Sequence, residues 1–213
     1  MLSVKQFVFN HFQTNCYVLW DEKTHECAII DPCMVSPDEE RRLSLFVTEK
    51  GLKVVKLLLT HAHVDHVAGL RWACTTYDLP VVTHRDSQRM LRQAEAYDEM
   101  MGFNVGSLAD IRLEFADGGD EIRIGEEALR CRYVPGHCIG SLCFVAGNPE
   151  MVFTGDALFR GSIGRTDLPG GNHEQLIEKI RTELLTLDDS CIVLPGHGES
   201  STIEEEKAWN PFL

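Results

Sequence analysis

The sequence lacks several features that would each point to a particular class of protein. No apolar stretch approaches the roughly 18 residues that a membrane-spanning helix needs, and residues 1–6 carry no basic segment followed by an apolar block, as a signal peptide would. Basic residues are few: 20 Lys and Arg stand against 33 Asp and Glu, the net charge is -13, and no basic cluster occurs. Nucleic-acid phosphates and anionic membranes are bound by basic surfaces. We therefore expect a cytoplasmic protein that acts on a small molecule and binds neither nucleic acid nor membrane.

The sequence also contains no Cys-x-x-Cys pair, although it has eight cysteines. Without such a pair, a thiolate zinc site or a thioredoxin-like redox motif is not expected. A chain of 213 residues with 44% hydrophobic content can bury a sizeable core and needs no disulfides to hold it together. Several of the cysteines lie in apolar, strand-like runs, where a reduced thiol packs as a small hydrophobic group. We therefore predict reduced cysteines and one domain that spans residues 1–213.

The first half of the chain alternates strand-like and helix-like segments. Three short strand-like runs open it, and the turn residues between them indicate a meander or hairpin. A helix is predicted next, with Ser36 as its N-cap and Gly51 just past its end. The run KVVKLLLT that follows is apolar in its centre, as in a strand buried on both faces. The predicted strands are 4–10, 15–20, 27–31, 53–60 and 80–84, and the predicted helices are 37–50 and 64–77.

Residues 86–110 interrupt this alternation and resemble an insertion or lid, helical in propensity from 86 to 101 and looser beyond. Strand-like runs then return. The predicted strands are 121–124, 128–134, 141–145, 151–154 and 191–194, and the predicted helices are 172–185 and 202–209. Two halves that are rich in strands and each supply helices predict two packed sheets with helices outside.

The segment 61–66, HAHVDH, carries the strongest chemical signal. It follows the predicted buried strand and precedes a predicted helix. His61 and His63 are two residues apart on extended chain and point to the same side, whereas Asp65 and His66 fall where the helix is expected to begin and aim differently. Imidazole and carboxylate are ligands of zinc, iron and manganese. One short segment can therefore offer two pairs of metal ligands.

Three further ligand-type residues each follow an apolar strand and stand beside a glycine: His137 after VPG, Asp156 after FTG and His197 after LPG. Glycine lets the backbone turn and approach a crowded centre closely. A single histidine in such a place is more often structural, but the repetition of the pattern at strand ends indicates one shared site. The candidate metal ligands are His61, His63, Asp65, His66, His137, Asp156 and His197.

This set of residues resembles the metallo-β-lactamase superfamily, and within it the glyoxalase II-like (hydroxyacylglutathione hydrolase-like) hydrolases. The match spans nearly the whole chain. The runs TGDALF at 154–159 and GRTDLPG at 164–170 look like that branch, and the ending at 202–206 and 210–213 is similar to small bacterial single-domain members. The resemblance implies an α/β (α+β) fold, a four-layer αββα sandwich with the site at one edge of the two sheets.

The resemblance also implies two divalent metal ions, zinc being the first expectation and iron or manganese the others. One ion would be held by His61, His63 and His137, the second by Asp65, His66 and His197, and Asp156 would bridge them. The implied reaction is hydrolysis of a thioester such as S-D-lactoylglutathione, in which the metal ions activate water to hydroxide and polarise the carbonyl group. Asp65 is the expected catalytic residue because it would orient that hydroxide.

Two departures from the family pattern leave the physiological substrate open. Full glyoxalase II enzymes carry a C-terminal helical domain that contributes to glutathione binding, and we expect it to be absent because the chain ends soon after His197. The third-histidine motif often continues with Thr-Pro-Gly, whereas this chain has Cys138, Ile139 and Gly140. The Cys138 thiol either tunes the site or fills the place of a threonine.

Substrate contacts are predicted at two arginines. Arg160 and Arg165 flank a glycine-rich stretch, and either guanidinium can bind a substrate carboxylate in a fork. The alternative for Arg165 is pairing with Asp167 to shape the loop. Segment 86–110 also has two interpretations: as a lid its apolar side chains would line a hydrophobic mouth, and as a surface helix they would pack into the core. These side chains are Tyr97, Met100, Met101 and Phe103.

Three alternative functions are compatible with the same residues. A mononuclear-iron persulfide dioxygenase-like enzyme of this fold would use His61, His137 and Asp156 as a facial set and leave the other ligands without metal. A lactonase would apply the hydrolytic site to another substrate. A binding or regulatory protein would keep the pocket without turnover, but such proteins usually lose ligands, and all seven are present here.

Overall fold

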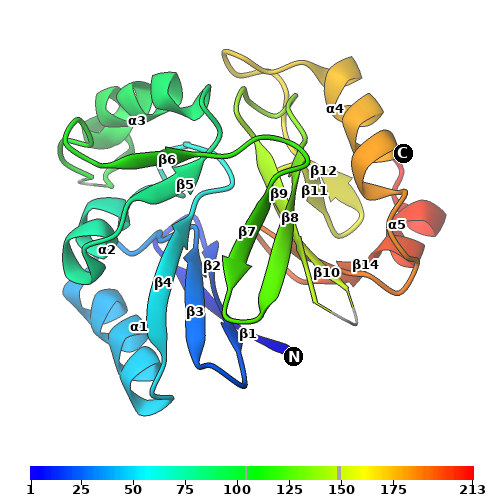
Figure 1. Cartoon of the computed structure of the whole chain (residues 1–213). Coiled ribbons are helices and arrows are strands. Elements are labelled where there is room, and N and C mark those ends of the chain that lie inside the picture. The colour runs from blue at the N-terminus through cyan, green and yellow to red at the C-terminus, as the bar shows by residue number, and fades with distance from the viewer. Residues whose placement is uncertain (104, 148–149) are drawn as a thin grey trace.

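The first half of the chain forms a sheet in which antiparallel and parallel strands meet (Figure 1). The computed structural model describes residues 1–103, 105–147 and 150–213. β1, β2 and β3 form the antiparallel meander that the sequence predicts, and β3 to β6 run parallel because helices connect them. The strands, in their order across the sheet, are β1 (Leu2–Phe9), β2 (Thr14–Asp21), β3 (Glu26–Ile30), β4 (Lys53–Leu58), β5 (Val81–Thr83) and β6 (Leu113–Phe115).

The second half forms a second sheet with the strand order β14-β13-β10-β9-β8-β7. Its neighbours are antiparallel except for β10 and β13, which are parallel and are joined through a helical connection. A small hairpin of β11 and β12 lies outside this sheet. The strands are β7 (Glu121–Ile124), β8 (Glu127–Tyr133), β9 (Leu142–Ala146), β10 (Met151–Gly155), β11 (Leu158–Phe159), β12 (Ser162–Ile163), β13 (Ile192–Pro195) and β14 (Ser201–Thr202).

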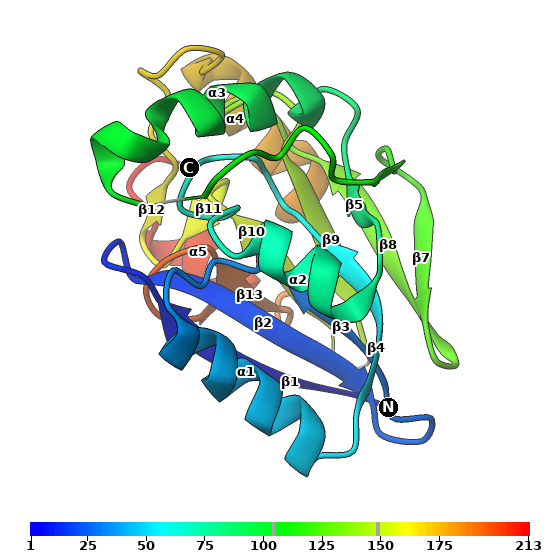
Figure 2. The same ribbon diagram turned by 90° about the vertical axis from the view of Figure 1, so that its left-hand side faces the viewer.

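Helices cover the outer face of each sheet, which gives four layers. The helices beside the first sheet are α1 (Pro37–Glu49), α2 (Leu70–Tyr77) and α3 (Ser87–Met101). Those beside the second are α4 (His173–Lys179), continued by a π-helical turn at Ile180–Leu184, and α5 (Ile203–Trp209). Figure 2 shows α1, α2 and α3 along one face, with α1 at one end and α3 at the other.

Three hydrophobic clusters separate these layers. One lies between the first sheet and its helices, one between the two sheets, where Leu58, Phe144 and Phe153 are buried, and one between the second sheet and α4. Burial of apolar side chains on both faces of each sheet is the main force that holds the layers together. The αββα sandwich expected from the resemblance is therefore confirmed.

The predicted helix boundaries hold where a capping residue marks them. Ser36 caps α1 by accepting a hydrogen bond from the Glu39 backbone N–H, and Gly51 adopts the left-handed conformation just past the end. Thr202 and Glu205 form a reciprocal capping box at the start of α5. Local side-chain chemistry fixes these ends, so the sequence alone was sufficient to place them.

The prediction of a helix from residue 64 was wrong, because α2 begins only at Leu70. Residues 64–69 form turns instead, and Gly69 donates a backbone hydrogen bond of 2.9 Å to the Pro32 carbonyl. A Cβ atom at Gly69 would lie 2.8 Å from the Met34 backbone nitrogen, so this close approach requires glycine. Asp65 therefore extends from a turn rather than from the first turn of a helix.

Within segment 86–110, of which residue 104 lies outside the described residues, the inner face of α3 packs against the first sheet. Leu91 and Ala94 are buried in the hydrophobic cluster there, together with Phe103. Tyr97, Met100 and Met101 remain partly or largely exposed. Phe103 therefore packs into the core as the surface-helix interpretation expects, whereas the lid interpretation stays a prediction. In the part of the chain that the structure describes, no helix is long and apolar enough to cross a membrane.

Candidate metal centre

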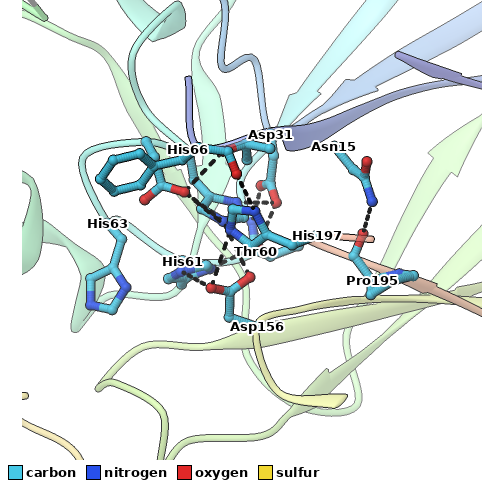
Figure 3. Close-up of polar contacts among 12 residues, drawn as sticks. Asn15, Asp31, Thr60, His61, His63, His66, Asp156, Pro195 and His197 are labelled. Atoms are coloured by element: carbon cyan, nitrogen blue, oxygen red, sulfur yellow. Dashed lines mark hydrogen bonds and ion pairs between the residues drawn. The ribbon is translucent and has the colours of Figure 1, made fainter. Parts of the chain in front are cut away.

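The carboxyl ends of several strands bring the predicted ligands together. β4 leads into Thr60 and His61, and β10 ends directly before Asp156. β10 and β13 run parallel, with Gly155 opposite Pro195, so Asp156 and His197 emerge at the same edge of the second sheet. Figure 3 shows the side chains of His61, His66, His197 and Asp156 gathered at this place.

Hydrogen bonds join the two sheets beside these ligands. The Asn15 backbone N–H donates to the Gly196 carbonyl at 2.7 Å, and the Tyr17 hydroxyl donates to the Pro195 carbonyl at 2.6 Å. The Asn15 side-chain amide also donates to Pro195 at 2.9 Å, a contact visible in Figure 3. Because β2 and β13 belong to different sheets, these bonds fix the position of His197 relative to the first sheet.

Three imidazoles and a carboxylate form the first group of ligand atoms. His63 Nδ1 lies 2.9 Å from His137 Nε2. Asp156 Oδ2 lies 3.7 Å from His137 Nε2 and 3.9 Å from His61 Nε2. All four ligand atoms lie within 4.8 Å of one another, so one ion can contact the whole set.

The second group consists of Asp65, His66 and His197, and it lies against the first. Asp65 Oδ2 is 3.5 Å from His66 Nε2 and 3.2 Å from His197 Nε2. Asp156 reaches this group as well, with Oδ1 at 3.3 Å from His66 Nε2 and Oδ2 at 3.6 Å from His197 Nε2. Its carboxylate therefore stands between the two groups, in the place that the family resemblance implies for a bridging ligand.

Both groups have the chemistry and spacing of a metal site. Ligands around a tetrahedral ion with bonds of roughly 2.1 Å are about 3.4 Å apart, and the distances above range from 2.9 to 3.9 Å. Among the described residues, three buried polar atoms here have no hydrogen-bond partner: His61 Nε2, His66 Nε2 and Asp156 Oδ1. Buried polar atoms in native proteins are normally satisfied, and metal ions would satisfy these. The residues therefore fit two divalent cations.

A buried carboxylate behind the centre orients two of the histidines. Asp31 Oδ2 accepts hydrogen bonds from His66 Nδ1 at 2.9 Å and from the Thr60 hydroxyl at 2.6 Å (Figure 3). Thr60 Oγ1 in turn lies 3.1 Å from His61 Nδ1, and the Thr60 backbone N–H donates to Asp31 Oδ1 at 2.7 Å. Such contacts fix the ring orientation and the tautomer of a metal-binding histidine. The Nε2 atoms of His61 and His66 are thereby left to face the centre.

Backbone carbonyl groups orient two further histidines in the same way. His137 Nδ1 donates to the Arg165 carbonyl at 2.8 Å, and His197 Nδ1 donates to the Phe12 carbonyl at 3.1 Å. In both rings the Nε2 atom then points at the carboxylate of Asp156. The surrounding chain thus orients four of the five candidate histidine ligands: His61, His66, His137 and His197.

The electrostatic field of the centre favours cations. Burial lowers the pKa of His61 well below its ordinary value and that of His63 to about 4, so both rings are neutral at pH 7 and able to bind a metal ion. Burial alone would also lower the pKa of His66, but the carboxylates of Asp65 and Asp156 outweigh it and raise that pKa. Burial would raise the pKa of Asp156, yet the histidines around it lower the pKa and keep it ionised.

Comparison with known proteins places this arrangement in a family. A sequence model of the metallo-beta-lactamase superfamily matches residues 10–197. The chain belongs to that superfamily. Among solved structures, that of the BLEG-1 B3 metallo-beta-lactamase matches with a TM-score of 0.89 at 31% identity and covers 99% of both chains.

Two curated members of the superfamily at similar distance differ in activity. The chain is 35% identical over 204 residues to the hydroxyacylglutathione hydrolase GloC of Haemophilus influenzae, covering 95% of this chain and 93% of that protein. It is 31% identical over 204 residues to the human mitochondrial persulfide dioxygenase ETHE1, covering 94% of this chain and 71% of that protein. Membership of the metallo-beta-lactamase superfamily therefore leaves the particular reaction to be inferred from the site.

In this superfamily member the centre opens into a cavity of about 540 Å³. His63, Asp65, His137, Asp156 and His197 form its floor, and a largely apolar wall rises around them. The ligand groups are thus accessible to a small molecule, while the His61 and His66 side chains lie buried behind them.

The two arginines that were predicted as substrate contacts lie in different places in the structure. Arg165 lines the cavity, and its Nε and Nη2 atoms donate to the Asp167 carboxylate at 2.8 and 2.7 Å. Arg160 lines a neighbouring hollow and pairs with Glu199 at 2.6 Å. Arg165 is therefore the better placed of the two to meet a substrate, and both remain predictions as substrate contacts.

Sequence analysis missed the residues that support the ligands from behind. Asp31 follows an apolar strand-like run, the same signal that identifies Asp156, but it lacks the neighbouring glycine that marks the other candidates. Its φ angle of 52° is one that Asp and Asn tolerate better than most residues. Thr14, whose hydroxyl donates to Asp65 Oδ2 at 2.9 Å, carries no sequence signal at all.

Gly196 illustrates why glycine stands beside these ligands. A Cβ atom at this position would collide with Asp156 Oδ1 and would lie 2.7 Å from His66 Cε1. The backbone after β13 can therefore approach the centre only without a side chain. This agrees with the expectation that glycine permits close approach to a crowded site.

Cys138 belongs to the hydrophobic cluster under α3 and is fully buried. Its thiol lies 3.3 Å from the Ser141 hydroxyl, and burial raises its pKa to about 12. A neutral, inaccessible thiol packs as a small side chain. The structure thus favours the filling role over a chemical one.

Proposed function

We propose that this protein is a metal-dependent hydrolase of thioesters, such as S-D-lactoylglutathione, which uses two divalent metal ions, with zinc as the first candidate and iron or manganese as the others. The observation that carries the proposal is the pair of ligand groups that share the Asp156 carboxylate. The similarity to GloC supports the choice of thioester. Metal ions at these positions would supply Lewis acidity, which lowers the pKa of a water molecule and polarises a carbonyl oxygen.

Asp65 is the residue that we assign to orient the attacking water. Its side chain lies on the cavity floor, and the Thr14 hydroxyl holds Oδ2 at 2.9 Å. Burial would raise the pKa of Asp65, but His66 and His197 lower it, so the carboxylate is ionised at neutral pH. An ionised carboxylate in a fixed position can accept a hydrogen bond from the attacking water. This bond orients the water so that a lone pair of the water oxygen faces the substrate.

The substrate is proposed to be a small molecule rather than a nucleic acid or a membrane. The net charge is -13, and the cavity in front of the ligands measures about 540 Å³, within the size range of small-molecule sites. Polyanionic partners require surfaces that neutralise phosphates. The composition and the cavity therefore support the same class of substrate.

A persulfide dioxygenase-like reaction is the second candidate, and the similarity to ETHE1 favours it. The facial set inferred for that reaction, His61, His137 and Asp156, lies within the first ligand group. The second group argues for the hydrolase, because Asp65, His66 and His197 would otherwise have no role in binding metal. Metal stoichiometry separates the two candidates.

The test combines metal analysis of the purified protein with assays of S-D-lactoylglutathione, a lactone and a persulfide under oxygen monitoring. Two equivalents of metal with thioester hydrolysis and no oxygen uptake are expected. One equivalent of iron with oxygen consumption would establish the second candidate instead. Preferential cleavage of the lactone would support a metal-dependent hydrolase whose substrate is a lactone rather than a thioester.

The role of Asp65 is tested by Asp65→Asn, which keeps the shape of the side chain and an acceptor for Thr14. Turnover per bound metal is expected to fall by about 100-fold or more, the range typical of a lost general acid–base group. Asp21→Asn is the control. Asp21 is also a buried carboxylate, but it lies at the end of β2 opposite Thr14, the residue that contacts Asp65. Undiminished turnover of Asp65→Asn at full metal loading would remove Asp65 from the mechanism.

A further inference from the structure

The cavity beside the ligand groups has an apolar wall, and we infer that it selects thioesters that carry an uncharged apolar group. This inference rests on the proposed thioester hydrolysis and narrows its substrate class. The wall, which we name the apolar shelf, is formed mainly by Phe12, Met90, Ala94, Tyr97, Met100 and Met101.

One side of the apolar shelf is a single face of α3. Met90, Ala94, Tyr97 and Met101 follow one another at intervals of four, three and four residues, which aligns them along the helix. Met90 and Ala94 line the cavity and are buried, whereas Tyr97 and Met100 are 43% and 71% exposed. The face therefore runs from the protein interior to the cavity rim beside the ligands.

Phe12, which also lines the cavity, is tied to the end of α3, so this part of the apolar shelf is held in place by the fold. The Phe12 ring packs against Phe103 at a centroid distance of 4.9 Å, and His11 packs against Phe103 at 4.5 Å. His11 Nε2 also lies 3.1 Å from the Met101 carbonyl, where it donates a hydrogen bond. The turn before β2 and the end of α3 are thus in direct contact beside the cavity.

Charge on the cavity wall does not match an anionic substrate group. Outside the ligand groups, Arg165 is the one residue with a permanent positive charge in the described lining, and its guanidinium is engaged by both oxygens of Asp167. A thioester of glutathione brings two carboxylates, for which a single, already paired guanidinium is a poor match. An alkyl or aryl group carries no charge, so it needs no charged partner on the cavity wall when it leaves water.

The exposed apolar side chains of the shelf are the ones that an alkyl or aryl group would remove from water. Tyr97, Met100 and Phe12 are each more than 40% exposed at one place beside the centre. Contiguous exposed apolar residues at a pocket generally mark a binding surface. Each methylene group that the apolar shelf takes out of water is expected to raise kcat/KM by about fourfold until the shelf is filled.

The experiment measures kcat/KM of the metal-loaded protein with two series of thioesters. In one series the thiol is N-acetylcysteamine and the acyl group is acetyl, butanoyl or hexanoyl, and in the other the acyl group is acetyl and the thiol is ethanethiol, butanethiol or hexanethiol. An increase of at least tenfold along one series is expected, and the series that responds identifies which part of the thioester the shelf binds. S-D-lactoylglutathione is measured alongside and is expected to be a poorer substrate than the best of these.

The variant Met100→Gln tests the surface itself, with Leu45→Gln as a matched control. Leu45 is 51% exposed on α1, away from the cavity, so both variants place the same polar side chain on an exposed helical position. Met100→Gln is expected to reduce the gain per methylene by at least half, and Leu45→Gln to retain it. Calorimetric titration with the hexyl thioether of N-acetylcysteamine, which has no bond to hydrolyse, provides a binding constant that should follow the same order.

The outcomes separate the two proposals. Hydrolysis of every thioester with no dependence on chain length, or a clear preference for S-D-lactoylglutathione, would overturn the apolar shelf and leave the thioester hydrolase intact. Hydrolysis of none by fully metal-loaded protein would refute the proposed function. A dimer that Met100→Gln converts to a monomer would mean that a second copy of the chain covers the shelf, which also overturns the inference.

Discussion

Replacement of Asp31 by asparagine tests whether the carboxylate behind the centre sets the metal affinity. The Asp31 carboxylate accepts three hydrogen bonds: from the Thr60 N–H at 2.7 Å, the Thr60 hydroxyl at 2.6 Å and His66 Nδ1 at 2.9 Å. Asparagine has nearly the same shape and tolerates the φ angle of 52°. The substitution therefore changes hydrogen bonding and charge while it leaves the backbone undisturbed.

The magnitude follows from the contact with His66. The amide oxygen of the substituted side chain can still accept from the Thr60 N–H, which turns the amide NH2 toward His66 Nδ1, itself a donor. His66 then either loses its bond to a charged acceptor, which costs about 1.5–3 kcal/mol, or moves its proton to Nε2 and can no longer bind metal there. At 1.36 kcal/mol per factor of ten, that cost corresponds to a loss of about 10–150-fold in metal affinity, consistent with the effect usual for such supporting contacts.

The assay is competition for metal between the protein and a chromophoric chelator, performed on the Asp31→Asn variant and on the parent protein. Asp21→Asn is the control: it alters another buried carboxylate that accepts several hydrogen bonds, at the end of β2 remote from the ligands. It is expected to lower thermal stability without weakening metal binding. Parental metal affinity in Asp31→Asn would show that the orientation of His66 does not depend on this carboxylate.

Three further predictions concern the metal ions, the close approach of the chain and the thiols. Removal of both metal ions by a chelator should lower Tm by about 10–20 °C relative to protein with metal at 100 times the Kd of each site, since each bound ion then contributes about 2.7 kcal/mol. An unchanged Tm would mean that no ion binds the folded state selectively. Gly196→Ala should displace Asp156, reduce the metal content of the purified protein and lower the free energy of unfolding by about 1–3 kcal/mol. Metal analysis and urea unfolding measure these two effects. Full metal loading of the variant would contradict the steric argument. Burial raises the pKa of the half-buried Cys74 to about 11, so at pH 8 only about one molecule in a thousand carries its thiolate. Thiol labelling of the native protein should therefore be slow at pH 8 and accelerate as pH rises toward 11, whereas rapid labelling at pH 8 would show that the thiols are accessible.

The convergence of the candidate ligands could be predicted from the sequence because each of them carries a local signal. His61 and His63 follow a strand whose carboxyl end is apolar and buried, and Asp156 and His197 each follow another apolar strand beside a glycine. Strands that end at a common edge bring distant residues together without any knowledge of exact distances. Helix ends marked by Ser36 or by the Thr202 capping box were equally accessible, since capping depends on neighbours in the chain.

Features that depend on contacts between distant segments were decided only by the tertiary structure. Helix α2 starts at Leu70 because Gly69 packs against the backbone near Pro32. No local sequence pattern indicates this contact between distant segments. The support of Asp65 by Thr14 likewise joins residues 51 positions apart.

The surroundings of the ligands show the same division. The apolar residues of α3 could be recognised in the sequence, but their separation into a buried set and a set that lines the cavity depends on how the helix lies against the sheet. Arg160 and Arg165 looked equivalent as charges, and the folded chain placed only one of them at the cavity. Local sequence determines which chemical groups stand at the ends of strands and helices, whereas packing between segments determines what each group faces, because side-chain contacts across the fold have no periodicity in the chain.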